Sequence, residues 1–210
     1  MATAGRPRGF DREAAVDSAM LLFWERGYDR ASLDELRRVM GAGKGISSAS
    51  FYAAFESKDA LYREALSRYL TLYGGMVGIL RDQGLPPRER LERALRASIA
   101  VQGDSAHPLG CMLTLSAPFS SGPGNGAQEG AHAVAAAGRA YTREVLRDCL
   151  QAGVNAGDLA SGADLPGLLA LYDGFLLGVS IQVRDGVPMA AIEAAVTSAM
   201  AAWDACRTGR

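Results

Sequence analysis

The chain has 210 residues, of which 49% are hydrophobic, and its formal net charge is -1. A chain of this length can form one or two domains with a substantial core. Because the net charge is close to zero, no basic field covers the whole molecule, and any contact with nucleic acid must depend on locally placed charge.

Three cysteines, Cys111, Cys149 and Cys206, are an odd number without paired spacing, and the N-terminus does not look like a signal peptide. These features favour a reducing cytoplasm. The most apolar stretch, residues 165–183, contains a proline, an aspartate and three glycines. We therefore predict a buried helix there and no membrane partner.

Residues 1–9 contain small side chains and the run Arg6-Pro7-Arg8-Gly9, without any apolar period. This composition predicts a flexible basic arm. Arg6 and Arg8 can enter the minor groove of A/T-rich DNA. The alternative is a solvated tail that contacts nothing.

Two short helices are expected next. Asp11 suits the N-cap of a helix that ends near Gly27, where glycine fits the C-cap position. Ser32 and Glu35 have the spacing of a capping box for a second helix as far as Met40. The residues that would close a three-helix core over these elements are Phe23, Trp24, Tyr28, Leu33, Leu36, Phe51 and Phe55.

Residues 41–46 read GAGKGI and form a glycine-rich loop with Lys44 at its apex. Lys44 can reach a phosphate, or the loop can be a tolerated surface insertion. The loop is also similar to the phosphate loop of nucleotide kinases. That motif needs a glycine in place of Arg38, a serine or threonine in place of Gly45, and a preceding buried strand, so we reject nucleotide binding.

The segment at 47–58 has the layout of a small helix presented to a polyanion. Ser47, Ser48 and Ser50 place short hydroxyls at the start of the helix, where they can enter a major groove. The hydroxyl of Tyr52 can reach a phosphate, and Lys58 adds its charge to the positive end of the next helix.

With Gly27-Tyr28 before it and a helix after it, this segment resembles the DNA-binding domain of TetR/AcrR-family transcriptional regulators. The family pattern is a tyrosine and a phenylalanine three apart, then a lysine that opens the next helix, matched here by Tyr52, Phe55 and Lys58. The loop at 41–46 departs from the family, because it is about four residues longer than the usual turn.

The resemblance implies an all-α fold of about nine helices. It divides the chain into the arm at 1–9, a helix-turn-helix DNA-binding domain at 10–69 and a ligand-binding and dimerisation domain at 70–210. Periodicity predicts the later helices at 57–81, 87–102, 109–117, 127–152, 165–184 and 189–206. The family pairs its last two helices, here the eighth and ninth, in a homodimer; the alternative is that these faces pack within one chain.

The resemblance also implies two binding sites. The residues expected to hold a palindromic operator in double-stranded DNA are Arg6, Arg8, Ser32, Lys44, Ser47, Ser48, Ser50, Tyr52 and Lys58. The residues expected around a small-molecule effector of unknown identity are Leu80, Cys111, Met112, Leu115, Phe119, Tyr141, Tyr172 and Phe175. Each residue of the second set can equally be ordinary core.

Gly110-Cys111 before apolar residues is similar to a pattern in a subset of the family, a few members of which sense electrophiles or oxidants through cysteine. Cys111 is therefore either a sensor thiol or a small buried hydrophobe. His107 and Cys111 lie four apart, and His132 or Cys149 can complete a metal site. Because Pro108 disturbs the helical spacing, we expect no metal and no cofactor.

We expect a transcriptional regulator, which we interpret as a repressor. It would release DNA when a ligand shifts the helix at 57–81. Two alternatives are a redox or electrophile sensor that uses Cys111, and a ligand-binding module whose DNA binding is impaired by the loop at 41–46. An enzyme is disfavoured, because residues 70–210 contain no nucleophile–base spacing and no carboxylate pair on a recognisable frame.

Overall fold

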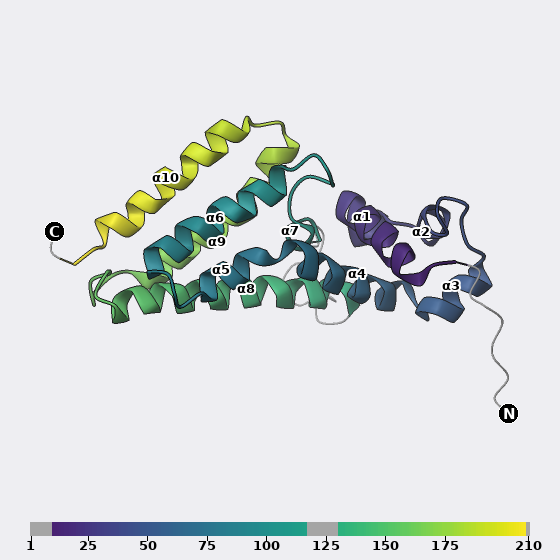
Figure 1. The fold of residues 1–210 in the computed structure, drawn as a ribbon, viewed down its shortest axis with the longest axis horizontal. Helices are drawn as coiled ribbons and strands as arrows, with labels where there is room; N and C mark the ends of the chain where they lie inside the picture. Colours follow the sequence, from purple (N-terminus) through teal and green to yellow (C-terminus); the bar gives the residue numbers. More distant parts are fainter. Residues whose placement is uncertain (1–9, 117–129, 209–210) are drawn as a thin grey trace, which may run out of the picture.

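The computed structural model describes residues 10–116 and 130–208 (Figure 1). The arm at 1–9 with Arg6 and Arg8, and the candidate pocket residue Phe119, lie outside these ranges. The described residues form ten helices and no strand. The helices are α1 (Arg12–Arg30), α2 (Leu33–Val39), α3 (Ser48–Phe55), α4 (Lys58–Tyr73), α5 (Gly75–Arg81), α6 (Pro87–Gly103), α7 (Met112–Leu115), α8 (Gly130–Asn155), α9 (Leu165–Arg184) and α10 (Met189–Ala205).

Side-chain caps fix the starts of the first helices. Asp11 accepts hydrogen bonds from the backbone N–H groups of Glu13 and Ala14. The capping box of Ser32 and Glu35 is present in both directions, as the spacing predicts. Each cap satisfies backbone donors that the helix itself leaves open.

The helix expected at 57–81 is two helices, which is why the described residues form ten helices in place of about nine. The N–H of Gly74 donates to the carbonyl of Leu70 and closes α4. A Cβ at position 74 would lie 2.3 Å from that carbonyl oxygen, so the break requires glycine. The eighth and ninth helices of the prediction are α9 and α10.

The helix expected at 109–117 is also shorter than the pattern suggested, since only Met112–Leu115 is helical. Gly110 has φ of +82°, in the left-handed region, and its N–H donates to the carbonyl of Gln102. This turn brings α7 back onto α1, where Trp24 Nε1 donates to the carbonyl of Gly110 over 2.9 Å.

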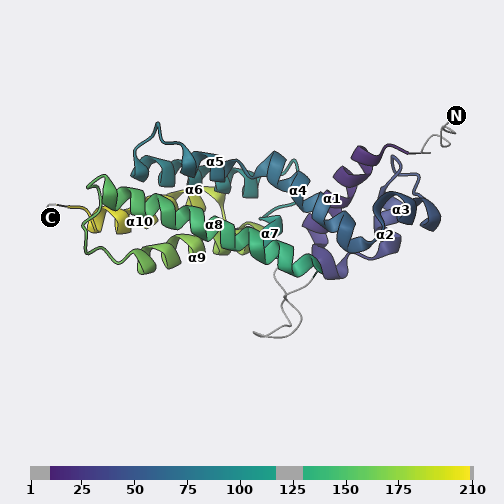
Figure 2. The same cartoon turned by 90° about the horizontal axis from the view of Figure 1, so that it is seen from below.

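The buried apolar side chains form two clusters. The first contains residues of α1 to α4 together with Met112, Leu113 and the first turns of α8. The second joins α5, α6 and the later part of α8 to α9 and α10. Figures 1 and 2 show α1 to α3 at one end of an elongated molecule and the C-terminus at the other, with α8 running along α4 and α5. The helices α4 and α8 therefore connect the two clusters.

Among the described helices, α9 alone has the length and composition of a membrane span, with a mean hydropathy of 1.4. Only 33% of its apolar window is buried, so the expectation of a buried helix is met on one face only. That face packs against α6, α8 and α10 through Leu168, Tyr172, Leu176 and Val179. Leu171 and Ile181 lie on the exposed face.

Candidate nucleic-acid interface and interior cavity

The helix α3 buries one face and exposes the other. Phe51 and Phe55 are anchored in the first cluster and are almost fully buried. This anchoring turns Ser48 outward and leaves Tyr52 51% exposed. The hydroxyl of Ser47 accepts from the N–H of Ser50 over 3.0 Å, which fixes the start of the helix. The surface of α3 therefore offers hydroxyl groups on a short, rigid element.

Lys58 begins α4 and lies beside the aromatic ring of Tyr28, with Nζ 4.2 Å from the ring centroid. Burial lowers the pKa of Lys58, while Asp29 and Asp59 oppose that shift. The hydroxyl of Tyr28 donates to the carboxylate of Asp59 and thereby holds the ring in place. The first turn of α4, which carries Lys58, follows α3 at the same end of the molecule (Figure 1).

Ser32 is exposed at the start of α2, and its hydroxyl is engaged in the cap with Glu35. Any contact that Ser32 makes with another molecule must share this hydroxyl. The hydroxyl proton is donated to the carboxylate of Glu35, so Ser32 can bind a phosphate only by turning this proton away from Glu35.

The long loop between α2 and α3 is tied back to α2. The N–H of Ile46 donates to the carbonyl of Arg37 over 3.0 Å, and Arg37 Nε returns a bond of 3.2 Å to the carbonyl of Ile46. Positive φ angles at Gly41, Ala42, Gly43 and Gly45 turn the chain within this short distance. Lys44 is exposed in the loop, and within the described residues it forms no ion pair. The preceding element is a helix, unlike the strand that a nucleotide-binding phosphate loop requires.

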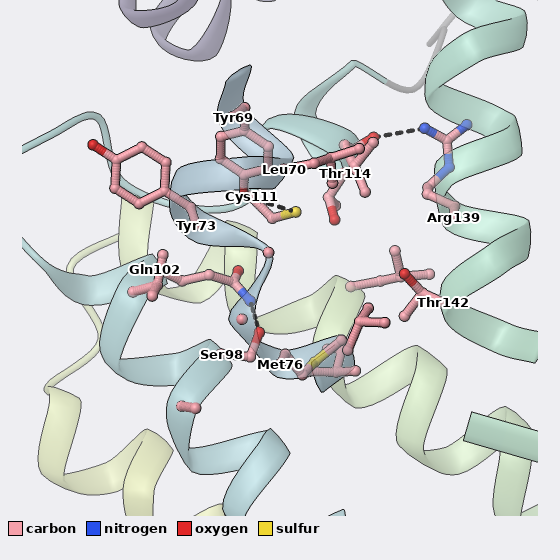
Figure 3. Close-up of a pocket in the computed structure, with 18 of the residues that line it drawn as sticks. Tyr69, Leu70, Tyr73, Met76, Ser98, Gln102, Cys111, Thr114, Arg139 and Thr142 are labelled. Carbon is pink, nitrogen blue, oxygen red and sulfur yellow. Dashed lines mark hydrogen bonds between the residues drawn. The ribbon is translucent and has the colours of Figure 1, made fainter. Parts of the chain in front are cut away.

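A partly open cavity of about 260 Å³ lies between α4, α5, α6, α7, α8 and α9 (Figure 3). Its wall is mostly apolar and includes the break between α4 and α5. The lining residues drawn and labelled in the figure are Tyr69, Leu70, Tyr73, Met76, Ser98, Gln102, Cys111, Thr114, Arg139 and Thr142.

Of the expected pocket residues in the described ranges, Cys111 alone lines this cavity. Leu80, Met112 and Tyr172 are buried in the two core clusters, and Phe175 packs against the second. Tyr141 is exposed beneath the guanidinium of Arg81, and Leu115 lines a separate hollow beside α1. The sequence did not single out Tyr69, Tyr73, Met76 and Arg139, because their approach depends on how six helices pack.

Cys111 sits where the turn before α7 meets α4 and α9. Its N–H donates to Ser180 Oγ over 3.2 Å, and the hydroxyl of Tyr69 donates to its Sγ over 3.4 Å. Burial is the main cause of a raised pKa for Tyr69, so this hydroxyl keeps its proton. The thiol therefore lies at the cavity wall with a neutral donor beside it.

Within the described ranges, no three His, Cys, Asp or Glu side chains lie close enough to hold a metal ion. His107 stacks on Trp24 with ring centroids 4.4 Å apart. His132 contacts Asp29 with Nε2 3.0 Å from the carboxylate, which joins α8 to the end of α1. Both histidines thus pack against aromatic residues of the first cluster, His107 on Trp24 and His132 on Tyr28.

The architecture is that of a helical protein with a helix-turn-helix at one end and a cavity in the other part. A family model described as "Bacterial regulatory proteins, tetR family" matches residues 15–65. A solved structure of the TetR family transcriptional regulator CifR, a cysteine mutant complexed with 26-bp double-strand operator DNA, is 36% identical with a TM-score of 0.82. The match covers 94% of this chain and 100% of that one. The chain belongs to the TetR family of transcriptional regulators.

Two curated relatives come from Escherichia coli (strain K12). The HTH-type transcriptional repressor ComR is 46% identical over 66 residues, which are 31% of this chain and 30% of ComR. The HTH-type transcriptional repressor BdcR is 34% identical over 110 residues, which are 52% of this chain and 53% of BdcR. The chain thus matches 30% of the length of ComR and 53% of the length of BdcR.

Proposed function

We propose that this protein is a DNA-binding transcriptional repressor that a small molecule releases from a palindromic operator. The observation that carries the proposal is the geometry of α3, in which Phe51 and Phe55 are buried and Ser48 and Tyr52 face outward beside Lys58. An α-helix with short polar side chains fits the major groove. The operator complex of CifR and the repressor names of ComR and BdcR support the same function.

The proposed DNA contacts fall into two groups. Ser47, Ser48 and Ser50 would approach base edges, while Tyr52, Lys58 and Ser32 would hold phosphates. Lys44 would add a phosphate contact from the long loop, and Arg6 and Arg8 would enter the minor groove. No enzymatic role is proposed, and the protein would act in the cytoplasm, where its operator lies.

The helix α4 is the proposed route from effector to DNA. Lys58 stands at its first turn, and Tyr69, Leu70 and Tyr73 of its last turns line the cavity. Lys58 and Tyr69 are separated by about 16 Å along the helix at 1.5 Å per residue. A ligand that displaced the end of α4 by an ångström or two would change the spacing of two recognition helices, which must match half-sites about 34 Å apart.

The helices α9 and α10 are the proposed dimer interface. Their exposed faces carry small or apolar residues, namely Ala170, Leu171, Gly174, Ile181, Ala190, Ala191, Ala194 and Ala201. No atom lies within 4 Å of a Cβ built at Gly174 in the described part of the chain, so another helix can approach closely there. A second copy would cover the exposed apolar face of α9 and supply the second recognition helix.

The test is equilibrium binding to a fluorescent fragment of the DNA upstream of the protein's own gene, at several salt concentrations. The double variant Tyr52→Phe with Lys58→Ala should bind DNA more weakly. The slope of log K against log salt concentration should become shallower by the equivalent of about one to two phosphate contacts. Arg147→Ala removes an exposed charge from α8 and is the matched control, because it lies outside the proposed interface. Equal affinity and equal salt slope for the wild type and the double variant would contradict the proposed contacts.

A second candidate function is sensing of electrophiles or oxidants through Cys111, favoured because this thiol lines the cavity. Modification there would occupy the space that a ligand would fill. Iodoacetamide should then release DNA from the wild type and not from Cys111→Ser, while Cys206→Ser behaves as the wild type. Release from Cys111→Ser at the wild-type rate would exclude this candidate.

A further inference from the structure

Arg139 is a half-buried cation in the cavity wall that forms no ion pair with a carboxylate of residues 10–116 or 130–208. It extends from α8, and its Nη1 donates to the carbonyl of Leu113 over 2.6 Å. No Asp or Glu oxygen of the described residues lies within ion-pair distance of its guanidinium. Burial is the largest cause of its lowered pKa. Since a guanidinium has five N–H donors, most of them remain available to a ligand.

Several other polar groups of the wall already form hydrogen bonds. Gln102 donates to Ser98 Oγ over 3.1 Å and accepts from Ser180 over 2.6 Å. The hydroxyl of Thr142 donates to the carbonyl of Gly138 over 3.2 Å. These groups have satisfied their main hydrogen bonds, so Arg139 is the polar group with the most unused capacity.

Asp173 is the only acidic residue among the lining residues described, and it faces Arg143 with 3.7 Å between the charged atoms. The charge of Asp173 also acts on Arg139, but one carboxylate stands beside two guanidinium groups, so a net positive charge remains at this part of the cavity. A partly desolvated guanidinium favours a planar anion such as a carboxylate, to which it can donate two parallel hydrogen bonds.

The size and lining of the cavity limit the rest of the ligand. A dry cavity of about 150 Å³ holds benzene, so one of about 260 Å³ holds roughly ten non-hydrogen atoms. Figure 3 shows Arg139 on α8 and the rings of Tyr69 and Tyr73 on α4, with the side chain of Met76 below them. The ligand therefore needs an apolar body and one charged end.

We propose that the effector is a small, largely apolar monocarboxylic acid whose carboxylate binds Arg139. This proposal rests on the proposed function, in which the cavity is the effector site. Because Arg139 also holds the carbonyl of Leu113 in α7, and α7 packs on α1, an acid bound at the free N–H groups of Arg139 would act on a side chain that links the cavity to the helix-turn-helix.

Isothermal titration of the full-length protein with three matched probes tests the proposal: phenylacetate, phenylacetamide and phenethylamine. Phenylacetate should bind at least about 10-fold more tightly than the amide, as expected for a charge-assisted hydrogen bond. Tighter binding of the amine would assign the site to Asp173 and overturn the proposal. Equal binding of acid and amide, or no binding of any probe at millimolar concentration, would overturn it too.

Two variants locate the charge. Arg139→Gln should reduce phenylacetate affinity about 10-fold or more and leave phenylacetamide affinity unchanged. Arg147→Gln, on an exposed turn of the same helix, should bind both probes as the wild type does. If Arg139→Gln bound phenylacetate as tightly as the wild type does, the proposed site would be wrong. The comparison of the three probes uses the wild-type protein, so it holds even if the variant does not fold.

Operator binding is measured separately on the same samples, so that the two proposals can fail independently. If the protein binds phenylacetate through Arg139 but binds no DNA, the proposed function fails and the assignment of the acid site stands. If it binds DNA selectively and prefers the amide or the amine, the acid proposal fails and the proposed function stands.

Discussion

Single side chains decide what each surface of this protein can do. On α3, Phe51 and Phe55 fix the orientation of the helix, and Tyr52 is exposed because it lies between them on the opposite face. At the start of α4, Tyr28 and Asp59 hold Lys58 where burial lowers its pKa. The direction in which a polar group points is therefore set by apolar and aromatic neighbours.

Cysteine reactivity should follow burial. Burial raises the pKa of Cys149 to about 11, so only about one thiol in a thousand is ionised near pH 8. Cys111 and Cys206 are less buried. In a thiol-labelling experiment on the folded protein, Cys149 should react last, whereas all three cysteines should react at similar rates in denaturant. Labelling of folded Cys149 as fast as Cys206 would be inconsistent with its position.

Close packing at Gly153 gives a stability prediction. A Cβ at this position in α8 would lie 2.6 Å from the ring of Trp203 in α10. Gly153→Ala should destabilise the fold, because overpacking costs about 1–3 kcal/mol and exceeds the gain in helix propensity of up to about 1 kcal/mol. In the described ranges, no atom lies within 4 Å of a Cβ built at Gly78 in α5. Gly78→Ala should therefore raise the urea midpoint of unfolding or leave it unchanged. A stabilised Gly153→Ala would refute this packing.

At the scale of elements, an ion network joins α6 to α10. Arg88 contacts Asp204 over 2.8 Å, and Arg96 contacts Glu193 over 3.1 Å. Glu92 lies between the two arginines on α6. Hydrogen bonds from Arg96 and Arg88 hold the pKa of Glu92 below its ordinary value.

This network predicts how stability depends on pH. Glu92→Gln should lower the free energy of unfolding by about 1 kcal/mol near neutral pH, because the pairs are partly exposed. The pKa of Glu92 is lower in the folded state, so its contribution is present above the ordinary value of about 4.3 and is lost as pH falls through the folded value. The free energies of unfolding of Glu92→Gln and the wild type, measured with urea, should therefore converge as the pH is lowered. A difference that stays constant with pH would contradict the lowered pKa of Glu92. Glu144→Gln, at an exposed position on α8, is the control.

The sequence predicts the elements better than it predicts the cavity. The caps at Asp11 and Ser32 were predictable because they depend on residues within three positions along the chain. Gly74, Gly75 and Gly78 have low helix propensity, but the position of the break depends on the contact of Gly74 with the carbonyl of Leu70. The cavity residues could not be separated from core residues, since apolar side chains on six helices look alike until the helices are packed.

At the scale of the molecule, the proposed recognition of a palindromic operator requires two copies of the chain. Leu171 on α9 is 42% exposed in the single chain, and Leu21 on α1 is 40% exposed. Leu171→Glu should convert the dimer to a monomer in size-exclusion chromatography with light scattering, because it would bury a charge in the proposed interface. Leu21→Glu, at the other end of the molecule, should remain dimeric. A dimeric Leu171→Glu would place the interface elsewhere.

The central claim is sequence-selective binding of a twofold-symmetric protein to DNA, and selection of binding sites from random duplex DNA tests it most directly. We predict enrichment of a palindrome whose half-site centres are about 34 Å, or one helical turn, apart, or a multiple of that distance. Tyr52→Phe with Lys58→Ala should weaken binding to the selected palindrome. Recovery of no enriched sequence by the folded wild-type protein would contradict the account.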